Sequence, residues 1–272
     1  TRQISKPIWS NMPERNEQDN HNHLIEDVKG IIGRAGNIAI VTGAGISAES
    51  GIPTFRGDDG YWHGIEVMAV ASLPMFQARP DILWDFCREK MWADALAAEP
   101  NAGHMALAQL CEDVRDPGGD CSIFTQNIDG LHSRARAANV YEMHGTLFTI
   151  FCDGEDCGFE TPYEEACVQF DMTQGVPTCP ECGENLRPKA ILFGEGLDYD
   201  LVAQATYACC HADVFISVGT SSIVAPVSML HHYAQMNDAT IIEVNPEDTP
   251  LSVVCDYKLQ GTACDILPQL VR

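Results

Sequence analysis

The sequence predicts an α/β protein built on a doubly wound parallel sheet, and two features of its hydrophobic pattern carry this prediction. First, short runs at residues 38–41, 122–125, 214–218 and 240–244 are mostly apolar, as in strands that are covered on both faces of a parallel sheet. Second, patterns with helical spacing lie between these runs. Strands that alternate with helices in this way are typical of a parallel sheet between two layers of helices.

The first helix follows a stretch without periodicity. Residues 1–22 contain several prolines and asparagines, and we expect them to form a flexible N-terminal arm. From residue 24 onward, apolar side chains lie on one helical face, at Leu24, Val28, Ile31 and Ile32. Gly36 and Asn37 then end this helix before the strand at 38–41.

Three later segments also have helical spacing, at residues 104–114, 201–210 and 227–236. Pro226 precedes the last of them, and proline is favoured in the first turn of a helix. Because ligands of such sheets bind beyond the carboxyl ends of the strands, the loops at 43–56, 126–132 and 219–222 are expected to meet in one site.

Two stretches interrupt the alternation. Residues 57–100 are rich in Met, Trp and Phe, which fits a small helical module or a lid, and residues 151–187 contain paired cysteines and turn residues. We therefore expect a flexible arm at 1–22 and one catalytic domain at 23–272. Its core would comprise residues 23–56, 101–150 and 188–272, with the helical module at 57–100 and a cysteine-rich module at 151–187.

Composition excludes two classes of partner. The chain of 272 residues carries 16 basic and 39 acidic side chains, a net charge of -23, which argues against a basic surface, and we expect no direct nucleic acid binding. No apolar run reaches the roughly 20 residues of a membrane helix, and we expect no membrane partner. Twelve cysteines in a long chain without a leader-like segment favour a reducing, cytoplasmic location.

The loop after the first strand has the features of a phosphate-binding loop. Gly43 and Gly45 can take positive φ angles and bring backbone N–H groups close to an anion, and Ala44 and Ser47 are small enough to allow this approach. A Gly-x-Gly turn alone often serves packing only. The continuation through small and rigid residues to the cationic Arg56 favours a binding loop.

The cysteine-rich module has the spacing of a zinc site. Four residues separate Cys152 from Cys157, two separate Cys179 from Cys182, and each pair lies among turn-forming residues. Two such pairs about twenty residues apart match a tetrahedral site of four thiolates. Four protein ligands leave no position for water or substrate, so the metal would be structural. Cys167 lies between the pairs without a partner of its own.

Polar side chains gather after the second predicted strand and again around His144. Residues 125–132 (TQNIDGLH) contain amides suited to a neutral carboxamide, and Asp129 can orient an amide or stabilise a developing cation. Asn127 can position a hydroxyl or a water molecule. His144, at a strand end beside a glycine, can act as a general base or be structural, and we expect His132 to be structural through a bond to the loop backbone.

Two further loops suit a nucleotide. Residues 219–222 (GTSS) offer hydroxyls and N–H groups to a phosphate or a ribose, and Asn245 and Glu247 can hold ribose hydroxyls. Dinucleotide-binding dehydrogenases place an acidic residue about twenty positions after the glycine loop. Only Glu66 lies near that spacing, which argues against hydride transfer.

Together these motifs resemble the sirtuin family of NAD-dependent protein deacylases. The matching segments follow the order of that family over about residues 24–271, and they are 43–56 (GAGISAESGIPTFR), 125–132, 144–145 (HG), the four cysteines, 193–195 (FGE), 219–221 and 245–247. The resemblance implies a Rossmann-like core with a zinc module and a helical insertion. It also implies NAD as co-substrate, one structural zinc ion and an acyl-lysine protein or peptide as substrate.

The resemblance implies a role for each matching position. The pyrophosphate and ribose of NAD would lie against Gly43, Ala44, Gly45, Ser47, Ile52, Pro53, Phe55 and Arg56, with Phe55 shielding the reacting sugar carbon. The nicotinamide pocket would be lined by Gln126, Asn127, Ile128 and Asp129. The remaining phosphate and the adenosine would contact Gly219, Thr220, Ser221, Asn245, Glu247 and Cys264.

Catalysis would rest on His144 as general base, with Asn127 and Asp129. The substrate backbone would pair as an added strand with the segment at 191–196, which includes Ile191, Phe193, Gly194, Glu195 and Gly196. The acyl group of lysine would move to ADP-ribose as nicotinamide leaves. Zinc would take no part in this chemistry, in agreement with a closed four-thiolate site.

The acyl group is less certain from the sequence than the reaction. Family members that remove succinyl groups hold the acyl carboxylate with a Tyr-x-x-Arg pair, and Cys87 and Lys90 occupy these positions here. Lysine lacks the bidentate geometry of a guanidinium, which favours acetyl or another neutral group. Arg88, one residue away, leaves removal of acidic acyl groups open.

Two other activities remain possible on this reading. The chain could be an NAD-consuming ADP-ribosyltransferase or glycohydrolase, or a nucleotide-sensing module without turnover. The presence of His144 favours the deacylase, because base-assisted acyl transfer needs it and glycosidic cleavage alone does not.

Overall fold

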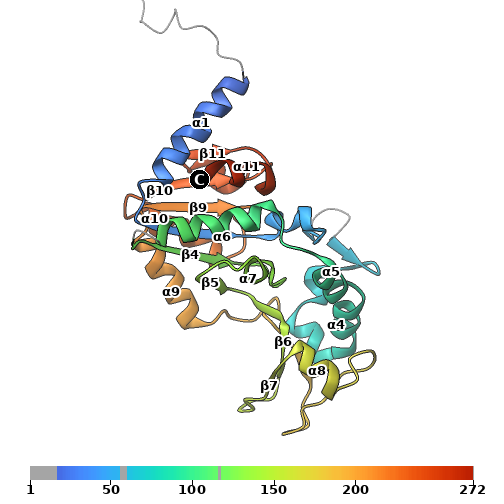
Figure 1. The fold of residues 1–272 in the computed structure, drawn as a ribbon. Helices are drawn as coiled ribbons and strands as arrows, with labels where there is room; N and C mark the ends of the chain where they lie inside the picture. The colour runs from blue at the N-terminus through green and yellow to red at the C-terminus, as the bar shows by residue number, and fades with distance from the viewer. Residues whose placement is uncertain (1–16, 56–59, 116–117, 272) are drawn as a thin grey trace, which may run out of the picture.

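A computed structural model describes residues 17–55, 60–115 and 118–271, and within them a six-stranded parallel sheet forms the core (Figure 1). The strand order is β11-β10-β9-β1-β4-β5. The bounds are β1 (Asn37–Thr42), β4 (Asp120–Thr125), β5 (Val140–Glu142), β9 (Val214–Val218), β10 (Thr240–Val244) and β11 (Tyr257–Leu259). From β1 the chain builds outward to β5 and then returns to start again at β9. The sheet is therefore doubly wound, and its switch point lies between β1 and β9.

The helices cover both faces of this sheet (Figure 1). One face packs against α1 (Glu17–Ile32), α6 (Ala102–Arg115) and α11 (Ala263–Leu270), whose apolar residues share a core cluster with β1, β9 and β10. The other face packs against α9 (Tyr199–Cys210) and α10 (Leu230–Gln235). This arrangement confirms the predicted α/β class and the four predicted strands.

Two local predictions need correction. Residues 17–22 belong to α1, so the arm predicted at 1–22 is wrong over this part, and residues 1–16 lie outside the described range. The segment predicted as a helix from 227 begins as a short 3-10 turn (Val227–Met229) and becomes α-helical at Leu230. Pro226 precedes that turn, following a cis peptide bond, and is not in the first turn of an α-helix.

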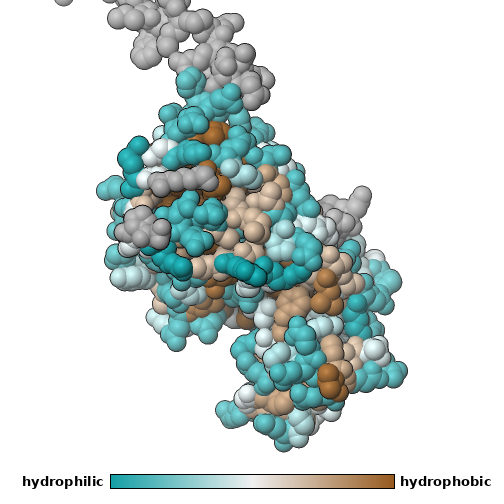
Figure 2. Space-filling view, viewed as in Figure 1, coloured by the Kyte–Doolittle hydropathy of each residue, from teal (hydrophilic) through white to brown (hydrophobic). Residues whose placement is uncertain are grey.

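A second, smaller body lies beside the sheet. Its first part contains β2 (Tyr61–Trp62), β3 (Ile65–Glu66), α2 (Val67–Val70), α3 (Leu73–Ala78), α4 (Pro80–Phe86), a π-helical turn (Cys87–Met91) and α5 (Trp92–Ala97). Its second part is an antiparallel sheet in the order β7-β6-β8, formed by β6 (Gly145–Cys152), β7 (Glu160–Pro162) and β8 (Leu186–Ala190), with α8 (Tyr163–Gln169). In the space-filling view this body is set off from the larger one by a narrowing (Figure 2).

The two parts of the second body share one hydrophobic core. Trp84 and Trp92 from the first part are buried against Leu147 and Ile150 of β6. Both indole N–H groups also cross the boundary, since Trp84 Nε1 donates to the carbonyl of Leu186 at 2.8 Å and Trp92 Nε1 donates to that of Leu147 at 3.0 Å. The segments expected as two modules therefore pack as one unit.

Two further features concern a disulfide and the hydrophobicity of the helices. Cys111 in α6 and Cys121 in β4 form a disulfide, which the sequence pattern did not indicate. Within the described residues, no helix combines the length and the hydrophobicity needed to cross a bilayer.

Candidate active site

The loops that follow the central strands meet at the switch point of the sheet. The loop after β1 contacts the loop after β9, because Gly43 donates its N–H to the carbonyl of Val218 at 3.0 Å. Gln126, just after β4, donates to the carbonyl of Thr42 at 2.9 Å. The three loops predicted to converge therefore lie together at the carboxyl edge of the sheet, where ligands of such folds bind.

The glycines of the first loop have a different role from the one expected. Gly43 is extended, with φ −129°, and Gly45 does not take a positive φ either. Their N–H groups donate within the protein, that of Gly45 to the carbonyl of Gly219 at 2.8 Å. A Cβ on Gly45 would lie 2.7 Å from the Cα of Gly219, and one on Gly43 would lie 2.9 Å from the Cα of Thr220. Both glycines are needed because two backbones pass in direct contact.

We therefore expect Gly45→Ala to separate the two loops. On the sequence prediction that these loops hold a nucleotide, overpacking of about 1 to 3 kcal/mol corresponds to a roughly 5- to 150-fold loss of its affinity. Isothermal titration with NAD measures this change. Gly158→Ala is the matched control, since a Cβ at Gly158 meets no atom within 4 Å and Gly158 has no positive φ. Equal NAD affinity in the two variants would contradict this role for Gly45.

Ser47, Asn127 and Asp129 form a buried polar cluster below these loops. The hydroxyl of Ser47 donates to Asp129 Oδ2 at 2.7 Å, and Asn127 Nδ2 donates to the Ser47 hydroxyl and to the carbonyl of Gly43, both at 3.1 Å. The N–H of Leu131 donates to Asp129 Oδ1 at 2.9 Å. Burial raises the pKa of Asp129, while these donors oppose the rise. A fixed carboxylate of this kind can stabilise positive charge that develops beside it.

Two buried histidines support the cluster from beneath. His132 Nε2 lies 2.9 Å from Thr42 Oγ1, and His104 lies 3.4 Å from Ser47 Oγ. Burial lowers the pKa of His104 to about 4 and that of His132 to about 3, so both are neutral at pH 7. The expectation that His132 is structural agrees with this position, although its partner is a threonine hydroxyl rather than the loop backbone. His104 was not anticipated, because a histidine within a helical pattern gives no sign of what it faces.

His144 has the geometry of a base. Its Nδ1 lies 3.0 Å from the carbonyl of Gln126, and a carbonyl can only accept, so Nδ1 carries the proton and Nε2 keeps its lone pair. Burial lowers the pKa of His144, which the bond to Gln126 partly offsets. The imidazole is therefore neutral near pH 7 and able to take a proton at Nε2.

Glu142 is a titrating group that the sequence pattern did not single out. It ends β5 two residues before His144, and burial together with the nearby charge of Asp129 raises its pKa to about 7. The sequence gives no periodic signal for Glu142, because β5 ends there and residues 143–144 form a turn.

The residues expected on the adenosine side hold one another. Asn245 is buried and donates from Nδ2 to the carbonyl of Thr220 at 2.8 Å, while the N–H of Glu247 donates to Asn245 Oδ1 at 3.2 Å. The N–H of Cys264 donates to Glu49 Oε2 at 3.3 Å, which brings the start of α11 to the first loop. The amide of Asn245 thus shapes the loop after β9, and Glu247 is exposed.

The other positions expected at the cofactor differ in their surroundings. Ile52 and Ile128 are partly buried against the core of the second body. Phe55 has a positive φ of 54°, unusual for a residue with a side chain, and its ring packs edge-on against Phe86 at 6.3 Å. Ala44, Pro53 and Ser221 are half-buried, and Arg56 lies outside the described residues.

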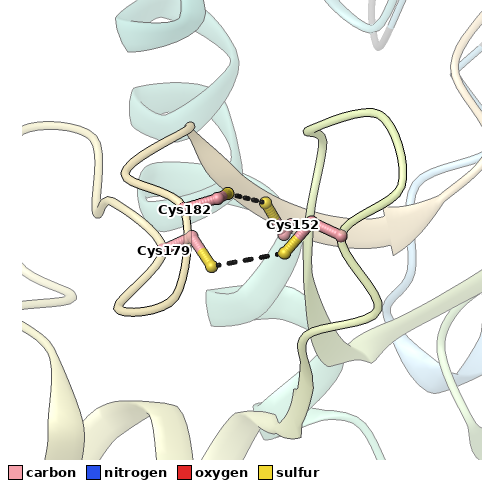
Figure 3. Close-up of side chains that lie close together, drawn as sticks. Cys152, Cys179 and Cys182 are labelled. Atoms are coloured by element: carbon pink, nitrogen blue, oxygen red, sulfur yellow. Dashed lines mark hydrogen bonds between the residues drawn. The ribbon is translucent and has the colours of Figure 1, made fainter.

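The four predicted cysteines come together as expected. Their sulfur atoms all lie within 4.8 Å of one another, with Cys152 Sγ at 3.3 Å from Cys182 Sγ and Cys157 Sγ at 3.7 Å from Cys179 Sγ. Figure 3 shows the sulfurs of Cys152, Cys179 and Cys182 turned toward one another. Tetrahedral zinc with bonds of about 2.3 Å places sulfurs about 3.8 Å apart, so this donor set fits a structural zinc ion.

The segment at 191–196 is a turn held to both bodies. Phe193 donates its N–H to the carbonyl of Ala71 at 2.9 Å and accepts from the N–H of Leu73 at 3.0 Å. The N–H of Ile191 donates to the carbonyl of His144 at 2.8 Å. Gly194, with φ 97°, makes no backbone hydrogen bond to another residue within the described ranges. Its exposed peptide groups are therefore where a substrate strand can pair, and Gly196 is exposed beside it.

None of the three side chains considered for an acyl carboxylate provides an available guanidinium. Cys87 is buried, and burial raises its pKa to about 12. Lys90 forms an ion pair with Asp94 at 3.1 Å. Arg88 donates to the carbonyls of Met172 and Gly175 and lies 5.0 Å from the Trp84 ring, so it ties the two parts of the second body together.

Comparison with known proteins gives a consistent result across three kinds of similarity. The model of the Sir2 family matches residues 43–226. The NAD-dependent protein deacylase of Aquifex aeolicus is 40% identical over 227 residues, which cover 84% of this chain and 90% of the relative. The NAD-dependent protein deacylase of Corynebacterium glutamicum is 36% identical over 267 residues, which cover 96% of this chain and 98% of the relative.

Solved structures agree with these sequence relatives. A Sir2 homologue in complex with NAD superposes with a TM-score of 0.81 at 36% identity, covering 91% of this chain and 92% of that one. A Sir2 complex with p53 peptide and NAD+ superposes with a TM-score of 0.78 at 27% identity, covering 90% of this chain and 96% of that one.

Proposed function

The chain belongs to the Sir2 family, and we propose that, as an NAD-dependent protein deacylase, it removes acetyl or another neutral acyl group from lysine side chains. The observation that carries this proposal is that a proton acceptor and a buried, hydrogen-bonded carboxylate lie at the same edge of the sheet. His144 presents Nε2 as a lone pair, and Asp129 is held by Ser47 at the same edge of the sheet. NAD is the co-substrate, and the acyl-lysine belongs to a protein or peptide, as in the related complex with p53 peptide.

Each residue of the cluster has a defined part in the proposed reaction. Asp129 would stabilise the positive charge that develops on the ribose as nicotinamide leaves, and Asn127 would position a hydroxyl or a water molecule. The acyl oxygen then attacks the sugar carbon. His144 removes a proton from a ribose hydroxyl, so that the acyl group moves to ADP-ribose and water releases the lysine.

The remaining contacts would hold the substrates in place. Residues of the first loop, from Gly43 to Phe55, and the loop at 219–221 would hold the phosphates, and Asn245, Glu247 and Cys264 would contact the adenosine. The four cysteines would bind zinc, which stabilises the fold of the second body and supplies no reacting group.

Product analysis tests the reaction itself. Incubation with NAD and an acetyl-lysine peptide should yield nicotinamide, deacetylated peptide and O-acetyl-ADP-ribose in equal amounts. Formation of ADP-ribose without deacetylated peptide would instead assign the chain to glycohydrolases or ADP-ribosyltransferases.

We expect an acetyl peptide to be turned over with a kcat/KM at least about tenfold above that of the matching succinyl peptide, a difference of about 1.4 kcal/mol. The reason is that Arg88 is bound to backbone carbonyls and Lys90 to Asp94, which leaves a succinyl carboxylate without a bidentate partner. Paired kinetics on two peptides of identical sequence measure the ratio. A succinyl rate equal to or above the acetyl rate would contradict the proposed preference.

A further inference from the structure

Arg187, at the start of β8, is a buried cation that contacts distant parts of the second body. Its side chain is 5% exposed. Nε donates to Asp153 Oδ1 at 2.7 Å, one terminal nitrogen donates to the carbonyl of Ala190 at 3.1 Å, and the other donates to Glu195 Oε1. Three nitrogens of one guanidinium are therefore committed to three acceptors.

Aromatic rings hold the guanidinium in this position. Its central carbon lies 4.6 Å from the ring of Phe151 and 5.4 Å from the ring of Phe76, which belongs to α3. A buried guanidinium is stable only when carboxylates and hydrogen bonds replace its water, and loss of one partner is costly. The guanidinium of Arg187 and the carboxylates of Asp153 and Glu195 therefore hold one another in fixed positions.

One end of this arrangement fixes the turn at 191–196. While Glu195 Oε1 accepts from Arg187, its Oε2 accepts from the N–H of Leu192 at 2.6 Å. The N–H of Glu195 donates in turn to the carbonyl of Leu192 at 3.0 Å. The carboxylate therefore closes the turn that presents Gly194, and Arg187 sets the orientation of that carboxylate.

The other end fixes the first cysteine pair. Asp153 directly follows Cys152, and its N–H donates to the carbonyl of Asn185 at 3.0 Å, next to the second pair in the fold. Asp153 is 30% exposed, and Cys152, which precedes it in the chain, belongs to the four-cysteine cluster. A single side chain thus joins the cysteine cluster to the proposed peptide-binding turn.

We propose that Arg187 is a positioning residue that holds the peptide-binding turn in register with the cysteine cluster, and that it thereby sets the affinity for acyl-lysine peptide. The proposal rests on the proposed function in that it assigns the turn at 191–196 to the peptide. Each of the three guanidinium nitrogens of Arg187 donates to an acceptor within the protein, so the loss of Arg187 would act through Glu195.

The test uses Asp153→Asn, which keeps the shape of the side chain and removes its charge. We expect the KM for acetyl peptide to rise at least about fivefold, as for the loss of a hydrogen bond to a charged group, with kcat and the KM for NAD within about twofold of wild type. Zinc content should be unchanged. Glu160→Gln is the control, because it breaks the exposed ion pair with Lys189 in the same small sheet without contacting the turn, and it should leave the peptide KM unchanged.

A second variant and a second readout make the inference independent of activity. Hydrogen exchange of the backbone amides at 191–196 should be faster in Asp153→Asn than in wild type, while exchange in β1 stays the same. Arg187→Lys keeps the charge but cannot reach both carboxylates, and it should accelerate the same amides. If Asp153 and Glu195 act through Arg187, Asp153→Asn and Glu195→Gln will be non-additive in peptide KM.

The outcomes separate this inference from the proposed function. If wild type deacetylates the peptide but Asp153→Asn changes neither the peptide KM nor the exchange at 191–196, the inference is wrong and the function stands. If wild type releases no deacetylated peptide, the proposed function fails, and faster exchange at 191–196 in both variants would still support the structural role of Arg187. Unchanged exchange at 191–196 in both Asp153→Asn and Arg187→Lys would overturn the structural role of Arg187.

Discussion

Replacing His144 with alanine is expected to reduce deacetylation by a factor of about 10² to 10⁴, the usual contribution of a general base. NAD affinity should change little, because the contacts of His144 are to the carbonyl of Gln126 and, through its own carbonyl, to Ile191. Steady-state kinetics and NAD titration on the same preparation measure the two effects. Turnover like that of wild type would refute the assignment of His144 as the base.

The pH dependence gives a second measure of the same residue. Burial lowers the pKa of His144 below its ordinary value of 6.5, and the base is active only when neutral. Activity should therefore be fully present above that lowered pKa and fall as the pH drops through it. Glu142 titrates nearby, with a pKa of about 7. An acid limb that persists unchanged in Glu142→Gln belongs to His144, and one that disappears there belongs to Glu142.

Removing the metal is expected to unfold the second body while leaving the six-stranded sheet intact. Zinc binding contributes about 10 to 16 kcal/mol in small zinc-binding peptides, which is comparable to the whole stability of a typical domain. Cys179→Ser should therefore lose stoichiometric zinc and peptide turnover together. Metal analysis, peptide kinetics and hydrogen exchange of β6 and of β9 measure the three effects.

Cys167→Ser is the matched control for this experiment. Cys167 is an exposed cysteine of α8 that stands outside the four-cysteine cluster. The Cys167→Ser variant should retain zinc and wild-type peptide turnover. Retention of zinc and of wild-type peptide turnover by Cys179→Ser would show that this thiolate is not needed for the site.

The central sheet could be predicted from sequence because its inner strands are buried on both faces and are therefore mostly apolar. The bounds of β9 and β10 match the predicted runs. The edge strand β11 was not predicted, and β5 was indicated only by the strand end expected at His144, since three residues each carry too short a pattern. The start of α1 was missed for a related reason, because its first turns contribute no apolar face.

The candidate site could be predicted where chemistry and spacing coincide, as in the four cysteines. It could not be predicted where function depends on distant partners. Gly45 was expected to bring its N–H close to an anion, but its close contact is with the backbone of Gly219, 174 positions away, which has no local signal. Arg187 is likewise an ordinary residue in the sequence, and only the fold brings Asp153 and Glu195 to it.

The shared core of the second body has a consequence for evolution and for protein engineering. Trp84 and Trp92 come from the first part of the second body, and the carbonyls they bind, at Leu186 and Leu147, come from its second part. Neither part can be deleted or exchanged alone without leaving large indole surfaces and unpaired carbonyls. Substitutions in one should therefore be accepted only with compensating changes in the other, and a chimaera that alters peptide selectivity must transplant both segments as a pair.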